Sequence, residues 1–108
     1  MQDHDGLLVI EASSEGSTAL LTLKGEMDIS NAHTLHSHLT RVVGGGSTTV
    51  DIDMSAVTFM DSTGLGGLLE VRRLGAALVI RNPSAQVKRI LDLVSIEGVD
   101  GVEVVPAT

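Results

Sequence analysis

The chain has 108 residues, 43% of them hydrophobic, which fits one domain with a substantial core. It has no Cys and a formal net charge of −7, which excludes a disulfide framework and disfavours nucleic acid and anionic membranes as partners. Phe59 is the only aromatic residue, so single-stranded bases have almost nothing to stack on. The N-terminus lacks a basic region followed by an apolar core, and no apolar run reaches the ~20 residues that cross a bilayer, so we expect a cytoplasmic protein.

The first quarter of the chain predicts an antiparallel β-hairpin. Residues 7–10 form a short apolar run, and residues 19–23 alternate between apolar and polar side chains, which is typical of strands. Between them, residues 13–17 read Ser-Ser-Glu-Gly-Ser, a cluster that predicts a turn. Two strands joined by a short polar turn are expected to pair in antiparallel fashion.

A first helix is predicted within residues 31–43, where apolar side chains recur at helical spacing. Asp28 and Ser30 are both candidate caps at its start, and the three glycines at residues 44–46 would end it. Three histidines of this helix are expected on a solvated polar face rather than in a metal site, because the helix offers no supporting carboxylate; they are His33, His36 and His38.

The rest of the chain alternates strands with helices, which predicts parallel neighbours in a sheet. The expected elements are a strand at residues 48–53, a helix at 65–74, a strand at 77–80, a helix at 87–94 capped by Ser84, and a strand at 102–105. The strand at 77–80 is fully apolar and is therefore expected in the middle of the sheet. The predicted fold class is α/β: a mixed sheet of about five strands, in the order ββαβαβαβ, covered by helices.

The stretch Phe-Met-Asp-Ser-Thr-Gly-Leu-Gly-Gly, residues 59–67, is predicted to lead from a strand through a loop into the second helix. Ser62 and Thr63 are good helix caps, and Asp61 interacts favourably with the positive end of the helix dipole. The glycines permit a tight turn and the close approach of another surface. An exposed hydroxyl beside a carboxylate can serve as a phosphoryl acceptor or a docking point, although an ordinary helix cap is the simpler interpretation.

The sequence carries no pattern typical of an enzyme. Met60 occupies the position where a nucleophile elbow needs Gly, and Gly67 lacks the following Lys of a phosphate-binding loop. Asp51 and Asp53 share one face of a strand, where a solvated face is a simpler interpretation than an acid–base pair. We therefore expect no catalytic residues, no metal and no cofactor.

Three segments of the chain resemble the signature segments of STAS domains. They are Gly25-Glu26-Met27-Asp28, then Met60-Asp61-Ser62-Thr63-Gly64-Leu65-Gly66, then Asn82-Pro83-Ser84 followed by Val87-Lys88-Arg89-Ile90-Leu91. Their order and spacing are most similar to those of stand-alone bacterial anti-sigma factor antagonists. The resemblance implies a single STAS domain over residues 1–108, with a mixed sheet covered by helices.

The resemblance also implies a partner-switching mechanism in transcription regulation, often linked to stress responses. Such antagonists bind an anti-sigma factor that is also a Ser/Thr kinase and thereby release a sigma factor. The kinase phosphorylates the Ser after the loop Asp, which is Ser62 here with Thr63 as the runner-up, and a metal-dependent phosphatase resets it. The implied partner-binding residues are Asp28, Asp61, Ser62, Thr63, Gly64, Leu65 and Gly66.

Two other functions remain open for a chain with these segments. One is a non-enzymatic STAS scaffold of a stress-signalling assembly, and the other is an accessory subunit of a lipid or small-molecule transporter. An intact Asp-Ser-Thr-Gly loop, residues 61–64, favours the antagonist. The chain also stops where many members of the family add a terminal helix, which would expose a sheet edge and favour a weak homodimer.

Overall fold

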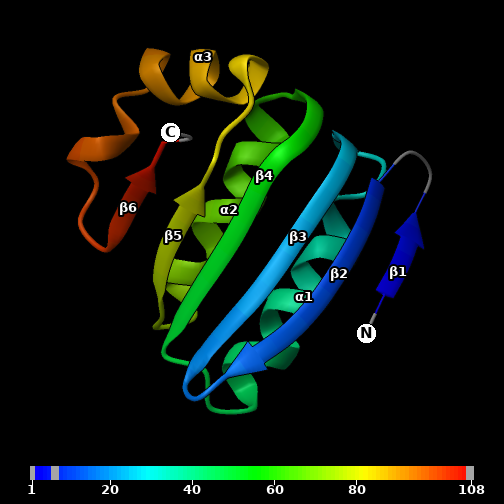
Figure 1. Ribbon diagram of the computed structural model, residues 1–108, viewed down its shortest axis with the longest axis vertical. Helices are drawn as coiled ribbons and strands as arrows, with labels where there is room; N and C mark the ends of the chain where they lie inside the picture. The colour runs from blue at the N-terminus through cyan, green and yellow to red at the C-terminus, as the bar shows by residue number, and fades with distance from the viewer. Residues whose placement is uncertain (1, 6–7, 107–108) are drawn as a thin grey trace.

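The computed structural model, which describes residues 2–5 and 8–106, contains a mixed six-stranded sheet (Figure 1). The strands are β1 (Gln2–Asp5), β2 (Leu8–Glu15), β3 (Thr18–Met27), β4 (Thr49–Met60), β5 (Ala77–Arg81) and β6 (Val102–Val105). The helices are α1 (Ala32–Gly44), α2 (Ser62–Arg73), α3 (Ala85–Leu93) and the 3-10 helix η1 (Ile96–Gly98). From β2 onward this confirms the predicted order ββαβαβαβ, and β1 is an additional strand ahead of it.

The strands lie side by side in chain order, from β1 at one edge to β6 at the other. The pairs β1–β2 and β2–β3 are antiparallel, as predicted for the hairpin, whereas β3–β4, β4–β5 and β5–β6 are parallel. The predicted central position of β5 is only partly right, since β5 is paired on both sides but lies next to the edge strand β6. The parallel strands β3, β4 and β5 therefore all point their carboxyl ends toward the same end of the sheet.

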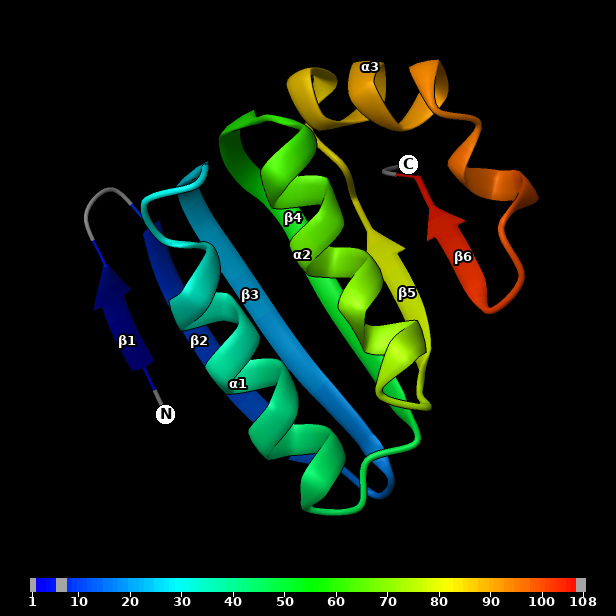
Figure 2. The same cartoon turned by 180° about the vertical axis from the view of Figure 1, so that it is seen from behind.

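Helices α1 and α2 cover one face of the sheet, as Figure 2 shows, and α3 lies beyond the end of β5. The core fills the space between this face and the two helices. Its strand residues include Leu21, Leu23, Val50, Ile52, Leu78 and Ile80, and its helix residues include Leu35, Leu39, Leu68 and Val71. Burying a side chain of this size stabilises the fold by about 1.5–3 kcal/mol relative to exposure. No helix among the described residues is long and apolar enough to cross a membrane.

The opposite face of the sheet carries charged side chains, in agreement with the predicted alternation of β4. The Arg81 guanidinium donates to both oxygens of the half-buried Asp51, at 2.8 Å from Nη2 and 3.1 Å from Nε. This hydrogen-bonded pair raises the pKa of Arg81. Burial opposes ionisation of Asp53, but donors on Ser55 and Asn82 outweigh it and lower the Asp53 pKa. Both carboxylates therefore hold neighbouring strands and loops together. They are engaged in these contacts and are not a free acid–base pair.

The loop predicted ahead of residue 65 is wrong, because strand and helix both extend into it. β4 continues to Met60, and α2 begins at Ser62 rather than at residue 65, so Asp61 alone connects them. The extension of β4 follows from two register shifts against β3, which keep the bulged strand paired as far as Met27 and Met60. The short polar and Gly residues at the start of α2 show no apolar periodicity. The sequence pattern therefore predicted the start of this helix three residues too late.

The expectation that the histidines share a solvated face is also wrong for one of them. His33 and His36 are exposed, but His38 is buried together with Leu35 and Leu39 on the face of α1 that packs on the sheet. His38 lies three residues after Leu35, so it falls on the same helical face. Among the described residues, no group of His, Asp and Glu side chains is placed to hold a metal ion.

Candidate functional site

The three signature segments converge at the end of the sheet toward which the carboxyl ends of β3, β4 and β5 point (Figure 1). Residues 25–28 close β3, residues 60–66 join β4 to α2, and residues 82–91 follow β5 into α3. In sheets with parallel strands, loops at the carboxyl ends commonly form binding sites. The structure thus brings together segments that lie as far apart as residues 25 and 91 in the chain.

The start of α2 packs directly against the end of β3. A Cβ atom added to Gly64 would lie 3.0 Å from the Met27 carbonyl oxygen and 3.1 Å from the Met27 Cβ. The same Cβ would lie 3.1 Å from Cγ of Met60. Gly64 is buried, and only a residue without a side chain allows this approach of helix to strand. This contact brings the first turn of α2 close to Asp28, the residue after Met27.

The helix cap of α2 is Asp61, which corrects the expectation that Ser62 or Thr63 caps it. Asp61 has extended backbone angles, and its carboxylate accepts a hydrogen bond from the Gly64 N–H at 2.9 Å. Ser62 and Thr63 are instead the first two helical residues, and both side chains are exposed. Among the described residues, neither hydroxyl has a hydrogen-bond partner. The Ser62 hydroxyl is therefore free to react or to dock beside a half-buried carboxylate.

Asp28 does not cap α1, and neither does Ser30, so that expectation is also wrong. The residue before α1 is Asn31, which is buried and whose side chain makes no cap hydrogen bond. The Asn31 side chain instead accepts from the Asp28 N–H at 3.1 Å and donates to the Glu26 carbonyl at 2.8 Å. The Asp28 carboxylate accepts from the Ser30 N–H at 2.9 Å. Asn31 thus stabilises the turn that presents Asp28, a role that the sequence pattern did not reveal.

The third segment ties α3 to the same end of the sheet. Ser84 caps α3 as predicted, since its hydroxyl oxygen accepts from the Val87 N–H at 3.4 Å. The same hydroxyl donates to the Val57 carbonyl of β4 at 2.6 Å. Asn82, which adopts a left-handed φ of 53°, donates from its side chain to Asp53 of β4 at 3.3 Å. These bonds make the segment a structural clamp that holds α3 on β4.

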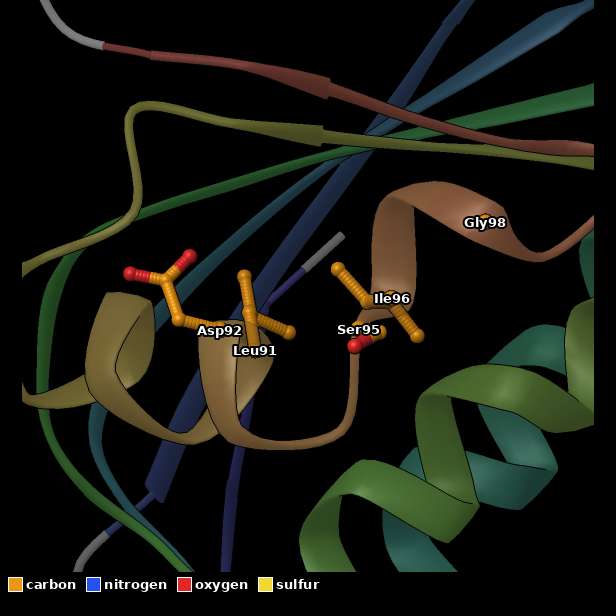
Figure 3. A pocket seen from close by; sticks show the side chains of 5 residues that line it. All are labelled: Leu91, Asp92, Ser95, Ile96 and Gly98. Atoms are coloured by element: carbon orange, nitrogen blue, oxygen red, sulfur yellow. The ribbon is translucent and has the colours of Figure 1, made fainter.

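Two hollows of the described part of the chain are lined by residues other than the predicted site residues. A hollow of about 240 Å³ between α3 and η1 is lined by Leu91, Asp92, Ser95, Ile96 and Gly98 (Figure 3). Among the described lining residues, Leu91 and Ile96 are apolar, and Asp92 and Ser95 carry polar side chains. The candidate site at the start of α2 lies outside this hollow, and its Ser62 and Thr63 side chains are exposed.

The chain belongs to the STAS domain family, because the family model matches residues 9–103, which is most of the chain. A search of curated proteins finds no significant match. The family assignment agrees with the mixed sheet and with the convergence of the three signature segments.

Solved structures share this fold at low sequence identity. An anti-sigma factor antagonist from Mycobacterium paratuberculosis is 23% identical, with a TM-score of 0.74, and the match covers 93% of this chain and 86% of that chain. The anti-sigma factor antagonist SpoIIAA in its unphosphorylated form is 21% identical, with a TM-score of 0.72 and coverage of 92% and 88%. The Bacillus cell fate determinant SpoIIAA in its phosphorylated form is 20% identical, with a TM-score of 0.65 and coverage of 92% and 91%.

Proposed function

We propose that the protein is an anti-sigma factor antagonist that binds its partner through the surface around Ser62 and is switched off by phosphorylation of that residue. The observation that carries this proposal is the position of the Ser62 hydroxyl. It is exposed, has no hydrogen-bond partner among the described residues, and opens α2 directly after the Asp61 cap. The partner in this proposal is an anti-sigma factor with Ser/Thr kinase activity, and a metal-dependent phosphatase restores the hydroxyl.

The similar structures support this choice among the functions open to a STAS domain. Two of them are described as anti-sigma factor antagonists, and SpoIIAA has been solved in both unphosphorylated and phosphorylated forms. Those two forms match 92% of this chain with the same fold. A fold that accommodates both states of a phosphorylation switch fits a function that depends on alternating between them.

The proposed reaction uses the Ser62 hydroxyl as a nucleophile while the kinase supplies ATP. The Oγ atom forms a bond to the γ-phosphorus, the bond from that phosphorus to the β,γ-bridging oxygen breaks, and ADP leaves. The hydroxyl proton passes to a base on the kinase. The product carries an added charge of about −1.5 to −2 next to Asp61 and near Asp28, in a chain whose net charge is −7.

The proposed partner surface comprises residues of two kinds. Asp28, Asp61, Ser62, Thr63 and Gly66 are exposed or half-buried and would face the partner. Gly64 and Leu65 are buried, so in this proposal they shape the surface from below. Leu65 anchors the first turn of α2 in the core, and Gly64 sets its distance from β3.

Phosphorylation of Ser62 is the direct test of the proposed function. We expect incubation with ATP and the cognate kinase, sought among the anti-sigma factor kinases of the source organism, to add one phosphate. Peptide mass spectrometry should place that phosphate on Ser62. The Ser62→Ala variant is the control and should remain unmodified, because the Thr63 hydroxyl one helical position further does not replace it. Phosphate found only on Thr63 would contradict the proposal. So would the absence of phosphate on both residues, provided that each kinase tested is shown to be active on another substrate.

Asp28→Asn should weaken partner binding without changing stability. The turn at Asp28 needs an oxygen that accepts the Ser30 N–H, and the Asn side chain supplies one, so the melting temperature should stay close to wild type. Removal of the charge should lower affinity for a basic partner surface, severalfold at low salt and less at high salt. Titration calorimetry at two salt concentrations measures both effects. Unchanged affinity at low salt would exclude Asp28 from the interface.

A further inference from the structure

Two apolar side chains at the candidate site are exposed without an evident structural reason. The Ile29 residue has 77% of its surface accessible and Phe59 has 45%. Phe59 is also the only aromatic residue of the chain, and it lies outside the buried core. An aromatic side chain is among the largest sources of core stability, so its placement on the surface forgoes a substantial stabilisation. A second use for that side chain, in binding, would explain its position.

The pairing of β3 with β4 brings the backbone of both residues near the start of α2. Met27 and Met60 are paired across the two strands, which places their Cα atoms about 5 Å apart. Phe59 precedes Met60, and Ile29 follows Met27 by two residues, as Ser62 follows Met60. Since consecutive Cα atoms are about 3.8 Å apart, each of these residues lies within about 8 Å of the Met pair. A standard interface buries about 800 Å² per partner, a patch about 30 Å across, so one partner can cover them all.

We infer that Ile29 and Phe59 are the two apolar anchors of the surface that binds the anti-sigma factor. This inference rests on the proposed function and names the side chains that supply most of its binding energy. Interface energy concentrates in a few buried apolar or aromatic groups surrounded by polar contacts that exclude water. Here the surrounding polar groups are Glu26, Asp28 and Asp61, all half-buried.

The charge of that surrounding ring defines the partner surface. Glu26 is paired with Phe59 across the strands, Asp28 precedes Ile29, and Asp61 follows Met60. A partner that matches this surface has apolar pockets for two side chains and basic side chains at their rim. The two kinds of contact respond differently to salt, because apolar burial is not screened whereas exposed charge pairs are.

The chain contains matched controls for both anchors on another element. Leu93 at the end of α3 has the same accessible fraction as Ile29, 77%, and the adjacent Val94 has 48%, close to the 45% of Phe59. Figure 1 shows α3 running from β4 toward the side of β6, so its last residues point away from β3. The variants Ile29→Ala and Phe59→Ala should therefore be compared with Leu93→Ala and Val94→Ala.

The experiment titrates each variant with purified anti-sigma factors of the source organism by calorimetry. We expect Ile29→Ala and Phe59→Ala each to raise the Kd by about tenfold or more, and both control variants to match wild type. The loss should be the same at low salt and at about 1 M salt, unlike the loss from Asp28→Asn. Thermal melts should show all four variants folded; Ile29→Ala, the more exposed position, decides the result if Phe59→Ala is destabilised.

Two results would overturn the inference and leave the proposed function intact. One is wild-type affinity of both anchor variants toward a partner that phosphorylates Ser62, and the other is an equal loss of affinity in the Leu93→Ala control. A wild-type protein that binds none of the anti-sigma factors overturns the anchors together with the proposed function. The phosphorylation of Ser62, measured in parallel, separates these cases.

Discussion

Ser62→Asp is expected to weaken binding of the anti-sigma factor by about a hundredfold or more. The substitution places a carboxylate in an interface that accepts a neutral hydroxyl, directly after the carboxylate of Asp61. Like charges forced together in a desolvated interface cost several kcal/mol, and each 1.4 kcal/mol changes Kd about tenfold. The first helical position favours a negative charge by only about 0.3–1 kcal/mol through the helix dipole. The dipole therefore offsets a minor part of the penalty.

The free protein should tolerate the same substitution. Ser62 is exposed and at the positive end of α2, so the folded state gains slightly from the added charge. Circular dichroism and the melting temperature of Ser62→Asp should match wild type, which identifies the effect as one on binding. Ser62→Ala is the control and should bind at least as well as wild type. It should also be nearly neutral in stability, because the cap of α2 is Asp61 rather than Ser62. Calorimetric titration with equal affinities for Ser62→Asp and wild type would contradict the proposed switch.

Gly64→Ala is expected to destabilise the fold at the site itself. The added methyl group would lie 3.0–3.1 Å from the backbone and Cβ of Met27 and from Cγ of Met60. Met27 ends β3 and is paired with Met60 of β4, so its backbone cannot yield easily. Overpacking of this kind costs about 1–3 kcal/mol, while the better helix propensity of Ala returns up to about 1 kcal/mol. We expect a net loss near 1 kcal/mol and a displaced first turn of α2.

Gly66→Ala provides the matched control two residues further along the same helix. A Cβ at Gly66 meets no atom within 4 Å among the described residues, so the substitution contributes only helix propensity. It should raise stability by about 0.5–1 kcal/mol. Urea denaturation should then separate the two variants by about 1–3 kcal/mol, with Gly64→Ala below wild type. Equal stabilities would show that α2 does not depend on close contact with β3, and would remove the structural reason for Gly64.

The strand and helix order could be predicted because burial on one face leaves a periodic record in the sequence. The alternation Val50, Asp51, Ile52, Asp53 predicted a strand with one apolar face, and the structure buries Val50 and Ile52 completely. The apolar strand at residues 77–80 was predicted in the middle of the sheet; β5 is paired on both sides, but it lies second from the edge. Element ends were less predictable, since the bulges of β4 and the Gly-rich start of α2 carry no periodicity.

The site residues could be named from sequence by their resemblance to a family, but their physical roles could not. Ser62, Thr63 and Asp61 are all acceptable cap residues, and only the backbone geometry decides that Asp61 accepts the Gly64 N–H. The sequence likewise offered Asp28 and Ser30 as caps, whereas Asn31 occupies that place and supports the turn. Local alternatives of nearly equal energy are resolved by tertiary contacts rather than by propensity.

By itself the sequence determined the class of fold and the acidic net charge, which follow from residue type and spacing. The three segments that belong together were recognised by their resemblance to a family. Only the tertiary structure decided which hydroxyls are free, why Gly64 is required, and that the exposed Ile29 and Phe59 accompany Ser62. Those properties depend on the pairing of β3 with β4, which joins residues more than thirty positions apart in the chain. Exposure and proximity of this kind arise from packing between distant segments, and no local pattern records them.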